Sequence, residues 1–138
     1  MKKYITCIFV SFFIIPIYGQ EDLWDVIREN SNFQYSADRP EIQKALKIYQ
    51  NNQYLVDRLS KNGQRYLYHM VDETLKRDMP VELALLPFVE SQFDPYAQSP
   101  AGASGIWQFI LSTAREQGLK RNWWYDGRRD IIASTNSA

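Results

Sequence analysis

One carboxylate stands directly after the most apolar stretch of the sequence. Every residue from Leu83 to Val89 is apolar, and Glu90 and Ser91 follow at once. A run without polar residues predicts a core helix surrounded by protein, so Glu90 would sit on a rigid, largely desolvated support at the end of that helix. Such a site suits a general acid, because desolvation favours the neutral carboxyl group. From these residues alone, a helix-ending surface glutamate is an equally good interpretation.

Pro87 and Glu82, which precede Glu90 in the sequence, are interpreted as structural residues. Pro87 lacks the N–H that would bond to the carbonyl of Leu83, and an interior proline costs a helix about 3 kcal/mol unless it is compensated. We expect it to kink the helix and to aim Glu90. Glu82 lies in the first turn after Pro80, where a negative charge complements the helix dipole.

Other kinds of catalytic centre have few residues to build on. The single cysteine, Cys7, lies in an apolar N-terminal segment, and the single histidine, His69, stands among Tyr66, Tyr68 and Met70. Neither belongs to a set of metal ligands. The formal net charge is zero, whereas a nucleic-acid binder needs a basic face for phosphates. We therefore expect no metal, no cofactor and no nucleic-acid partner.

The two ends of the chain carry further signals. Residues 1–19 are predicted to be a signal peptide, because Lys2 and Lys3 precede a short apolar run that ends before Gly19. That run is too short to span a bilayer, so membrane association would require this segment to remain uncleaved. We expect export to the periplasm or cell envelope. At the other end, Asp130 opens a capped helix that soon stops, which indicates a chain truncated at its C-terminus.

Apolar residues at three- and four-residue spacing predict a mainly α fold with five or more helices. We expect residues 20–79 to be an N-terminal helical segment, and residues 80–138 to form a second part that contains Glu90. In the first segment, Pro40 should begin one helix and Asn52 should cap the next. In the second part, a helical run is expected through Ile106, Phe109 and Ile110.

Three motifs together resemble a known family. They are Glu90-Ser91, then Gly102-Ala103-Ser104-Gly105-Ile106-Trp107-Gln108-Phe109, then Asn122-Trp123-Trp124-Tyr125-Asp126-Gly127-Arg128-Arg129-Asp130. At this spacing the chain resembles the family-1 lytic transglycosylases, which carry an SLT domain of the lysozyme-like superfamily, and above all the D group of their membrane-bound members. The resemblance runs from about Leu23 to Ala138. It implies a goose-type, SLT-like helical fold in which residues 80–138 are the N-terminal, incomplete part of the catalytic domain.

The resemblance also implies an activity on peptidoglycan glycan strands. Family members cleave the β-1,4 bond between N-acetylmuramic acid and N-acetylglucosamine without water and leave a 1,6-anhydromuramoyl end. Ordinary glycosidases use two carboxylates. In the single-carboxylate scheme, Glu90 would act first as acid and then as base. Two alternatives stay open, a muramidase-type hydrolase and a non-catalytic peptidoglycan-binding remnant of a truncated gene.

By the same resemblance, Ser91 and Gln108 would form hydrogen bonds around the acid or the sugar, and the turn 102–105 would approach the glycan. Trp107 and Tyr125 are further candidates for contact with sugar rings, although core packing is the default for aromatic residues. The carboxylates of Asp94, Asp126 and Asp130 are interpreted as turn or cap groups, and a second catalytic carboxylate among them would favour the hydrolase. Family members continue through helices with an Ala-Tyr-Asn motif, and often through LysM repeats, which this sequence lacks.

Overall fold

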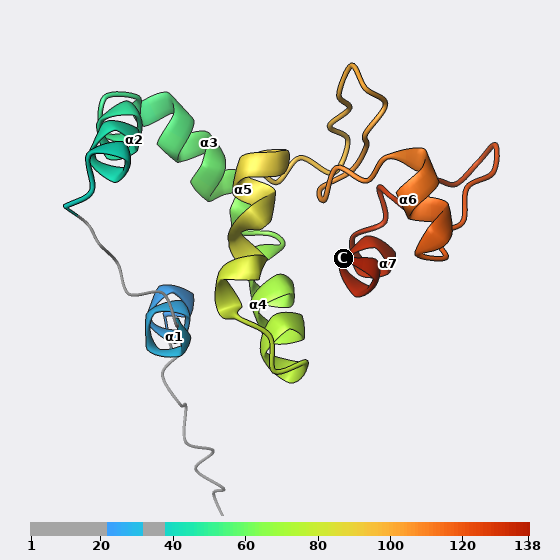
Figure 1. The fold of residues 1–138 in the computed structure, drawn as a ribbon, viewed down its shortest axis with the longest axis horizontal. Helices are drawn as coiled ribbons and strands as arrows, with labels where there is room; N and C mark the ends of the chain where they lie inside the picture. Colours follow the sequence, from blue (N-terminus) through green and yellow to red (C-terminus); the bar gives the residue numbers. More distant parts are fainter. Residues whose placement is uncertain (1–21, 32–37) are drawn as a thin grey trace, which may run out of the picture.

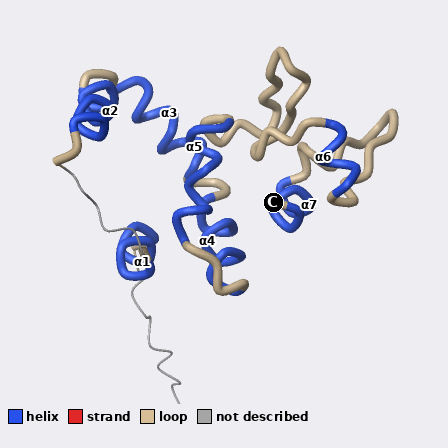
Figure 2. The backbone as a smooth tube through the Cα atoms, in the orientation of Figure 1, coloured by secondary structure: helices blue, strands red, loops and turns tan. Residues whose placement is uncertain are grey.

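The computed structural model describes residues 22–31 and 38–138, and within these ranges the fold is mainly helical, as predicted. Its elements are α1 (Leu23–Asn30), α2 (Pro40–Gln50), α3 (Gln53–Gly63), α4 (Leu67–Lys76), the 3₁₀-helix η1 (Val81–Leu85), α5 (Leu86–Glu90), α6 (Leu111–Glu116) and α7 (Ile131–Ser137). Figures 1 and 2 show these helices joined by loops. The expected signal peptide lies outside the described residues. Among the residues described, no helix is both long enough and apolar enough to cross a bilayer.

Short polar side chains begin several helices where the sequence predicts them. The side chain of Asn52 accepts a hydrogen bond from the backbone N–H of Leu55 at 3.0 Å, and Asp130 accepts one from Ala133 at 2.9 Å. Pro40 occupies the first turn of α2, where its missing N–H needs no partner. The two caps mark the starts of α3 and α7, and Pro40 marks the start of α2.

The core forms where α4 packs against η1, at the centre of the molecule (Figure 1). Its fully buried members include Met70 from α4, Val81 and Ala84 from η1, and Phe93 and Ile106 from the segment that follows α5. α2 has no buried residue and packs mainly against α3, and the two lie together at one end of the molecule. The core therefore supports α5 directly, whereas α2 contributes little to it.

The apolar run before Glu90 differs from the single core helix that we expected. It begins as η1 and continues as the five-residue α5, and Pro87 stands in the first turn of α5 rather than in a helix interior. In that position the missing N–H of proline needs no partner within α5, and the change from 3₁₀ to α geometry falls directly before it. Val81, Ala84 and Pro87 are buried, but Leu86 is 45% exposed and Val89 is 81% exposed. The run is covered on one side only.

Glu82 has a structural contact, although a different one from the expected dipole interaction. Its carboxylate is buried and accepts a hydrogen bond from the hydroxyl of Ser31, which directly follows α1. This bond ties the end of α1 to η1, whose first turn contains Glu82. Burial of a charged group needs such compensating hydrogen bonds.

The expected helical run through Ile106 to Ile110 is wrong. Residues 97–109 fold into a compact turn structure held by backbone bonds, among them Gly105 N to Ala97 O at 3.0 Å and Ser104 N to Phe109 O at 3.0 Å. Gly105 and Gln108 have φ values of +85° and +49°, which a right-handed helix does not allow. α6 begins only at Leu111.

Candidate active site

Glu90 is the last residue of α5, and its side chain is exposed to solvent. This corrects the expectation of a largely desolvated carboxyl group. Residues three and four apart share one face of a helix, so Glu90 lies on the same face as Leu86, and the exposed Val89 lies beside both. The other side of α5, through Pro87 and Phe88, packs on the core. Glu90 is therefore a carboxylate with apolar neighbours on an accessible face of a supported helix.

The turn directly after Glu90 is held in place from two sides. The Ser91 hydroxyl is buried and donates a hydrogen bond to the carbonyl of Ile106 at 2.8 Å. The side-chain amide of Asn62 donates to the carbonyl of Gln92 at 3.0 Å. Phe93 is buried and meets Phe88 edge to face, with ring centroids 4.4 Å apart. Glu90 thus emerges from a rigid junction between α3, α5 and the segment 97–109.

We expect Ser91→Ala to loosen this junction. The substitution leaves the buried carbonyl of Ile106 without the hydroxyl that now donates to it, and an unsatisfied buried acceptor costs about 1–3 kcal/mol. The free energy of unfolding, measured by urea denaturation, should fall by roughly that amount. Ser60→Ala is the matched control, because Ser60 is an exposed serine on α3. An equal loss in both variants would contradict a special role for Ser91.

Gln108 and Trp107 lie in the turn structure, and their polar groups bond to the protein itself. The side-chain amide of Gln108 donates to Gly105 O at 2.7 Å and to Ala97 O at 3.3 Å. The indole N–H of Trp107 donates to the hydroxyl of Thr135 at 3.0 Å. The ring of Trp107 also lines a pocket of about 440 Å³, together with Leu86 and other residues from α4, η1 and α7. Ser91 is thus hydrogen-bonded to the segment 97–109, and Gln108 stabilises the turn within that segment.

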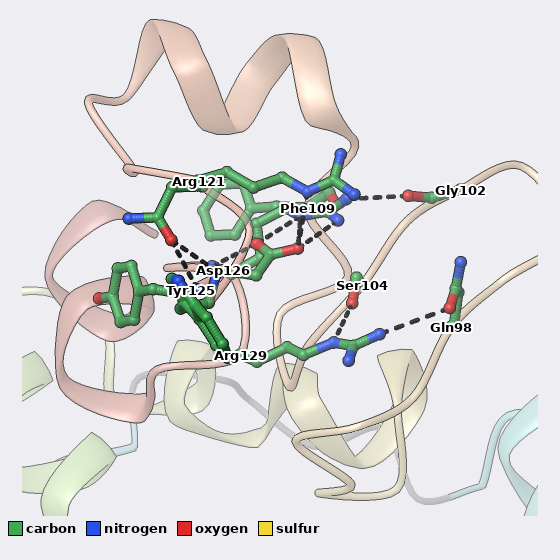
Figure 3. Close-up of polar contacts among 11 residues, drawn as sticks. Gln98, Gly102, Ser104, Phe109, Arg121, Tyr125, Asp126 and Arg129 are labelled. Carbon is green, nitrogen blue, oxygen red and sulfur yellow. Dashed lines mark hydrogen bonds and ion pairs between the residues drawn. The ribbon is translucent and has the colours of Figure 1, made fainter.

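Arg128 organises the same turn structure and was missed by the sequence analysis. Its guanidinium group is buried, donates to the carbonyls of Gly102 at 2.9 Å and Phe109 at 3.3 Å, and forms an ion pair with Asp126 at 2.6 Å. Figure 3 labels Gly102, Phe109 and Asp126, the three partners of this guanidinium group. Hydrogen bonds from Arg128, above all, lower the pKa of Asp126 below its ordinary value of 3.8. The sequence signal for this ion pair is the carboxylate of Asp126, which stands two residues before Arg128.

We expect Asp126→Asn to destabilise the fold by about 2 kcal/mol, because the Arg128 guanidinium group loses hydrogen bonds to a charged partner, which contribute about 1.5–3 kcal/mol. The stabilisation by Asp126 also depends on pH. Since the pKa of Asp126 is lower in the folded chain, its contribution is complete well above pH 3.8 and is lost as the pH falls below that value toward the folded pKa. Thermal unfolding from pH 7 to pH 2.5 should therefore show a smaller acid-induced decrease in Tm for Asp126→Asn than for the parent. Parallel pH profiles would contradict this role.

The other aspartates are engaged as turn and cap residues. Asp94 accepts a bond from the backbone N–H of Tyr96 at 2.8 Å, and Asp130 caps α7. The Tyr125 hydroxyl donates to the Asp130 carboxylate at 2.9 Å, and this bond raises the pKa of Tyr125. The pKa of Asp130 is lowered, first by the backbone N–H of Ala133 and then by Tyr125. The described ranges contain no group of three or more His, Cys, Asp or Glu side chains placed to hold a metal ion.

Comparison with known proteins places these features in a family. Residues 67–138, more than half of the chain, match the family model described as "Transglycosylase SLT domain". Membrane-bound lytic murein transglycosylase D of Escherichia coli strain K12 is 43% identical over 117 residues, which cover 85% of this chain and 26% of that protein. The putative tributyltin chloride resistance protein of Alteromonas sp. strain M-1 is 44% identical over 79 residues, 57% of this chain and 38% of that protein. The chain spans about a quarter of the length of the first of these relatives. The matched region contains Glu90, Ser91 and the whole turn structure. The chain therefore belongs to the transglycosylase SLT domain family.

Proposed function

We propose that this chain is the part of a peptidoglycan lytic transglycosylase that carries its acid/base residue, Glu90. One observation supports the proposal most. Glu90 ends a helix inside the SLT-matched region and is accessible, while the residue after it is fixed to the Gly105–Phe109 segment through Ser91 and Ile106. A general acid needs both access to substrate and a fixed position. The name of the relative from Escherichia coli, a lytic murein transglycosylase, supports peptidoglycan as the proposed substrate.

The reaction proceeds in two steps that use the same carboxyl group. Protonated Glu90 donates its proton to the glycosidic oxygen as the bond from that oxygen to C1 of N-acetylmuramic acid breaks. The N-acetyl carbonyl of the same sugar stabilises the positive charge at C1. The Glu90 carboxylate then removes the proton from the 6-hydroxyl, whose oxygen bonds to C1. The product is a 1,6-anhydro sugar, no water is consumed, and Glu90 ends protonated as it began.

The partners of the aspartates favour this scheme over hydrolysis. Asp126 is paired with Arg128, Asp130 caps α7, and Asp94 closes a turn. A muramidase-type hydrolase needs a second carboxylate that faces the substrate or a water molecule. Each of these three carboxylates instead has a structural hydrogen bond, so the two-carboxylate mechanism is the weaker alternative. A non-catalytic peptidoglycan-binding remnant is the third hypothesis, and product analysis distinguishes it from both enzymes.

Four further residues are proposed to contact the glycan strand. Ser91 would act by holding the turn that follows Glu90, and Gln108 by holding the turn structure of residues 97–109. Trp107 and Tyr125 would offer ring faces to the sugars. The polar groups of these side chains already bond within the protein. Their contribution is therefore to fix the surface, and contact with the sugar would come from ring faces and backbone. We also propose that the protein acts outside the cytoplasm, in the periplasm or cell envelope where peptidoglycan lies.

Mass analysis of muropeptides tests the function directly. Purified sacculi are incubated with the chain, and the soluble products are separated and weighed. Anhydro-muramoyl ends, which are lighter than reducing ends by one water molecule, support the lytic transglycosylase. Reducing ends would identify a hydrolase, and the absence of any release would favour the binding remnant. Both of these outcomes would overturn the proposal.

A further inference from the structure

The turn from Asn122 to Tyr125 holds two indole rings in solvent. Trp123 and Trp124 are 83% and 85% exposed, more than any other large hydrophobic side chain in the described part of the chain. Their ring centroids lie 4.1 Å apart in an edge-to-face arrangement. Tryptophan rings contribute strongly to binding when they are covered, and a contiguous exposed apolar surface often marks an interaction site. The pair therefore indicates a surface that a ligand covers.

This turn is fixed before any ligand arrives. The side-chain oxygen of Asn122 accepts hydrogen bonds from the backbone N–H groups of Trp124 and Tyr125, both at 2.8 Å. The backbone N–H of Asn122 donates to the carbonyl of Tyr125 at 2.8 Å, and Gly127 N donates to Lys120 O at 2.8 Å. A pre-organised turn loses little conformational entropy on binding. The indole pair is thus presented ready for contact.

The surroundings of the pair are polar, which narrows the class of ligand. The turn borders a pocket of about 590 Å³ that is also lined by Tyr96, Gln98, Arg121, Arg129 and Asp130. An N-acetylated sugar ring has an apolar C–H face that stacks on an indole and a rim of hydroxyl and amide groups that bond to such side chains. A lipid hydrocarbon phase would leave those polar groups without partners. An amino-sugar strand therefore fits the pocket better than a membrane.

Hydrogen bonds, together with the backbone of the turn structure, connect this pocket to the turn that follows Glu90. The guanidinium group of Arg129 donates to the Ser104 hydroxyl at 3.0 Å and to the side-chain oxygen of Gln98 at 3.4 Å (Figure 3). Ser104 belongs to the same turn structure as Ile106, whose carbonyl holds Ser91. Resting on the proposed function, we propose that Trp123 and Trp124 form a stacking subsite for an N-acetylated sugar of the peptidoglycan strand, separate from the residues around Glu90.

Calorimetric binding of chitohexaose tests the subsite, in Glu90→Gln chains so that no cleavage interferes. We expect Trp123→Ala and Trp124→Ala each to weaken binding roughly tenfold, as for an aromatic residue at the centre of a contact. The conservative variants Trp123→Phe and Trp124→Phe should lose less, because a smaller ring face remains. Tyr54→Ala is the control, because Tyr54 is 75% exposed on α3 and lies outside this pocket. All variants should unfold thermally like the parent, since both indoles are exposed.

The proposal is overturned if the parent shows no chitohexaose binding, or if both alanine variants bind as tightly as the parent. It is also overturned if they keep chitohexaose binding and lose only their binding to vesicles of anionic phospholipid. Product analysis of chains with intact Glu90 tests the proposed function independently of the chitohexaose binding that tests the subsite. Tryptophan-dependent binding without anhydro products would retain the subsite and reject the function, whereas anhydro products with unchanged binding would do the reverse.

Discussion

Replacing Glu90 by glutamine should reduce the release of anhydro-muropeptides from sacculi by roughly a thousandfold or more. Glutamine has nearly the same shape but neither donates an acidic proton nor accepts one, so both steps of the proposed reaction lose their proton carrier. General acid–base groups contribute about 10²–10⁴-fold to rates. The Glu90 side chain is exposed, so Tm should stay at the parent value. Initial rates of product release, measured by liquid chromatography and mass spectrometry, test this expectation.

Glu116→Gln provides a closely matched control. Glu116, like Glu90, is an exposed glutamate that ends a short helix, α6. Its variant should release anhydro products at the parent rate, because Glu116 lies outside the segments that hold Ser91. If Glu90→Gln kept the parent rate, the catalytic assignment would be wrong even for an active enzyme. If both variants lost activity, a general effect of charge would explain the loss.

Gly105→Ala should destabilise the fold by at least about 3 kcal/mol, the largest stability effect that we expect. A Cβ atom at this position would lie 1.7 Å from the carbonyl oxygen of Arg128, and the φ of Gly105 is +85°. The contact is with backbone, so relief requires the segment around Arg128 to move. Overpacking costs about 1–3 kcal/mol or more, and a left-handed conformation adds about 1–2 kcal/mol for a residue other than glycine. Urea denaturation measures the loss.

Gly102→Ala separates the clash from the backbone strain. Gly102 also has a positive φ, of +81°, but no atom lies within 4 Å of its added Cβ. We expect a loss of about 1 kcal/mol, from conformational strain alone. A similar loss in the two variants would show that the close approach of Gly105 to Arg128 does not limit stability. Because Gly105 adjoins Ile106, its substitution should also weaken the hydrogen bond that Ser91 donates to Ile106.

Local signals in the sequence predicted much of the fold. The structure confirms the predicted caps at Asn52 and Asp130 and the proline at the start of α2. These features could be predicted because a cap depends on only a few neighbouring residues. Family membership could also be predicted from the sequence, since the motifs from Glu90 to Asp130 are specific in residue type and spacing. The SLT match over residues 67–138 confirms it.

The errors concern properties that depend on distant parts of the chain. The apolar run before Glu90 was predicted to be covered on all sides, yet Leu86 and Val89 are exposed, because composition does not say which face meets a neighbouring element. The periodicity of Ile106, Phe109 and Ile110 predicted a helix, but Gly105 and Gln108 adopt positive φ within a turn held by Arg128. A long-range arginine contact of this kind leaves no periodic pattern in the sequence.

The attachment of Arg128 to the carbonyls of Gly102 and Phe109 has a consequence for the order of assembly. A chain growing from its N-terminus completes α5 and the segment 97–109 before residue 128 leaves the ribosome. Until then the carbonyl groups of Gly102 and Phe109 lack their charged donor, and we expect the turn structure that contains Ile106 to be less ordered. We therefore expect the turn structure beside the end of α5 to become ordered only once Arg128 is present. A chain that ends before Arg128 should then be cut by proteases between Tyr96 and Ile110 more readily than the parent.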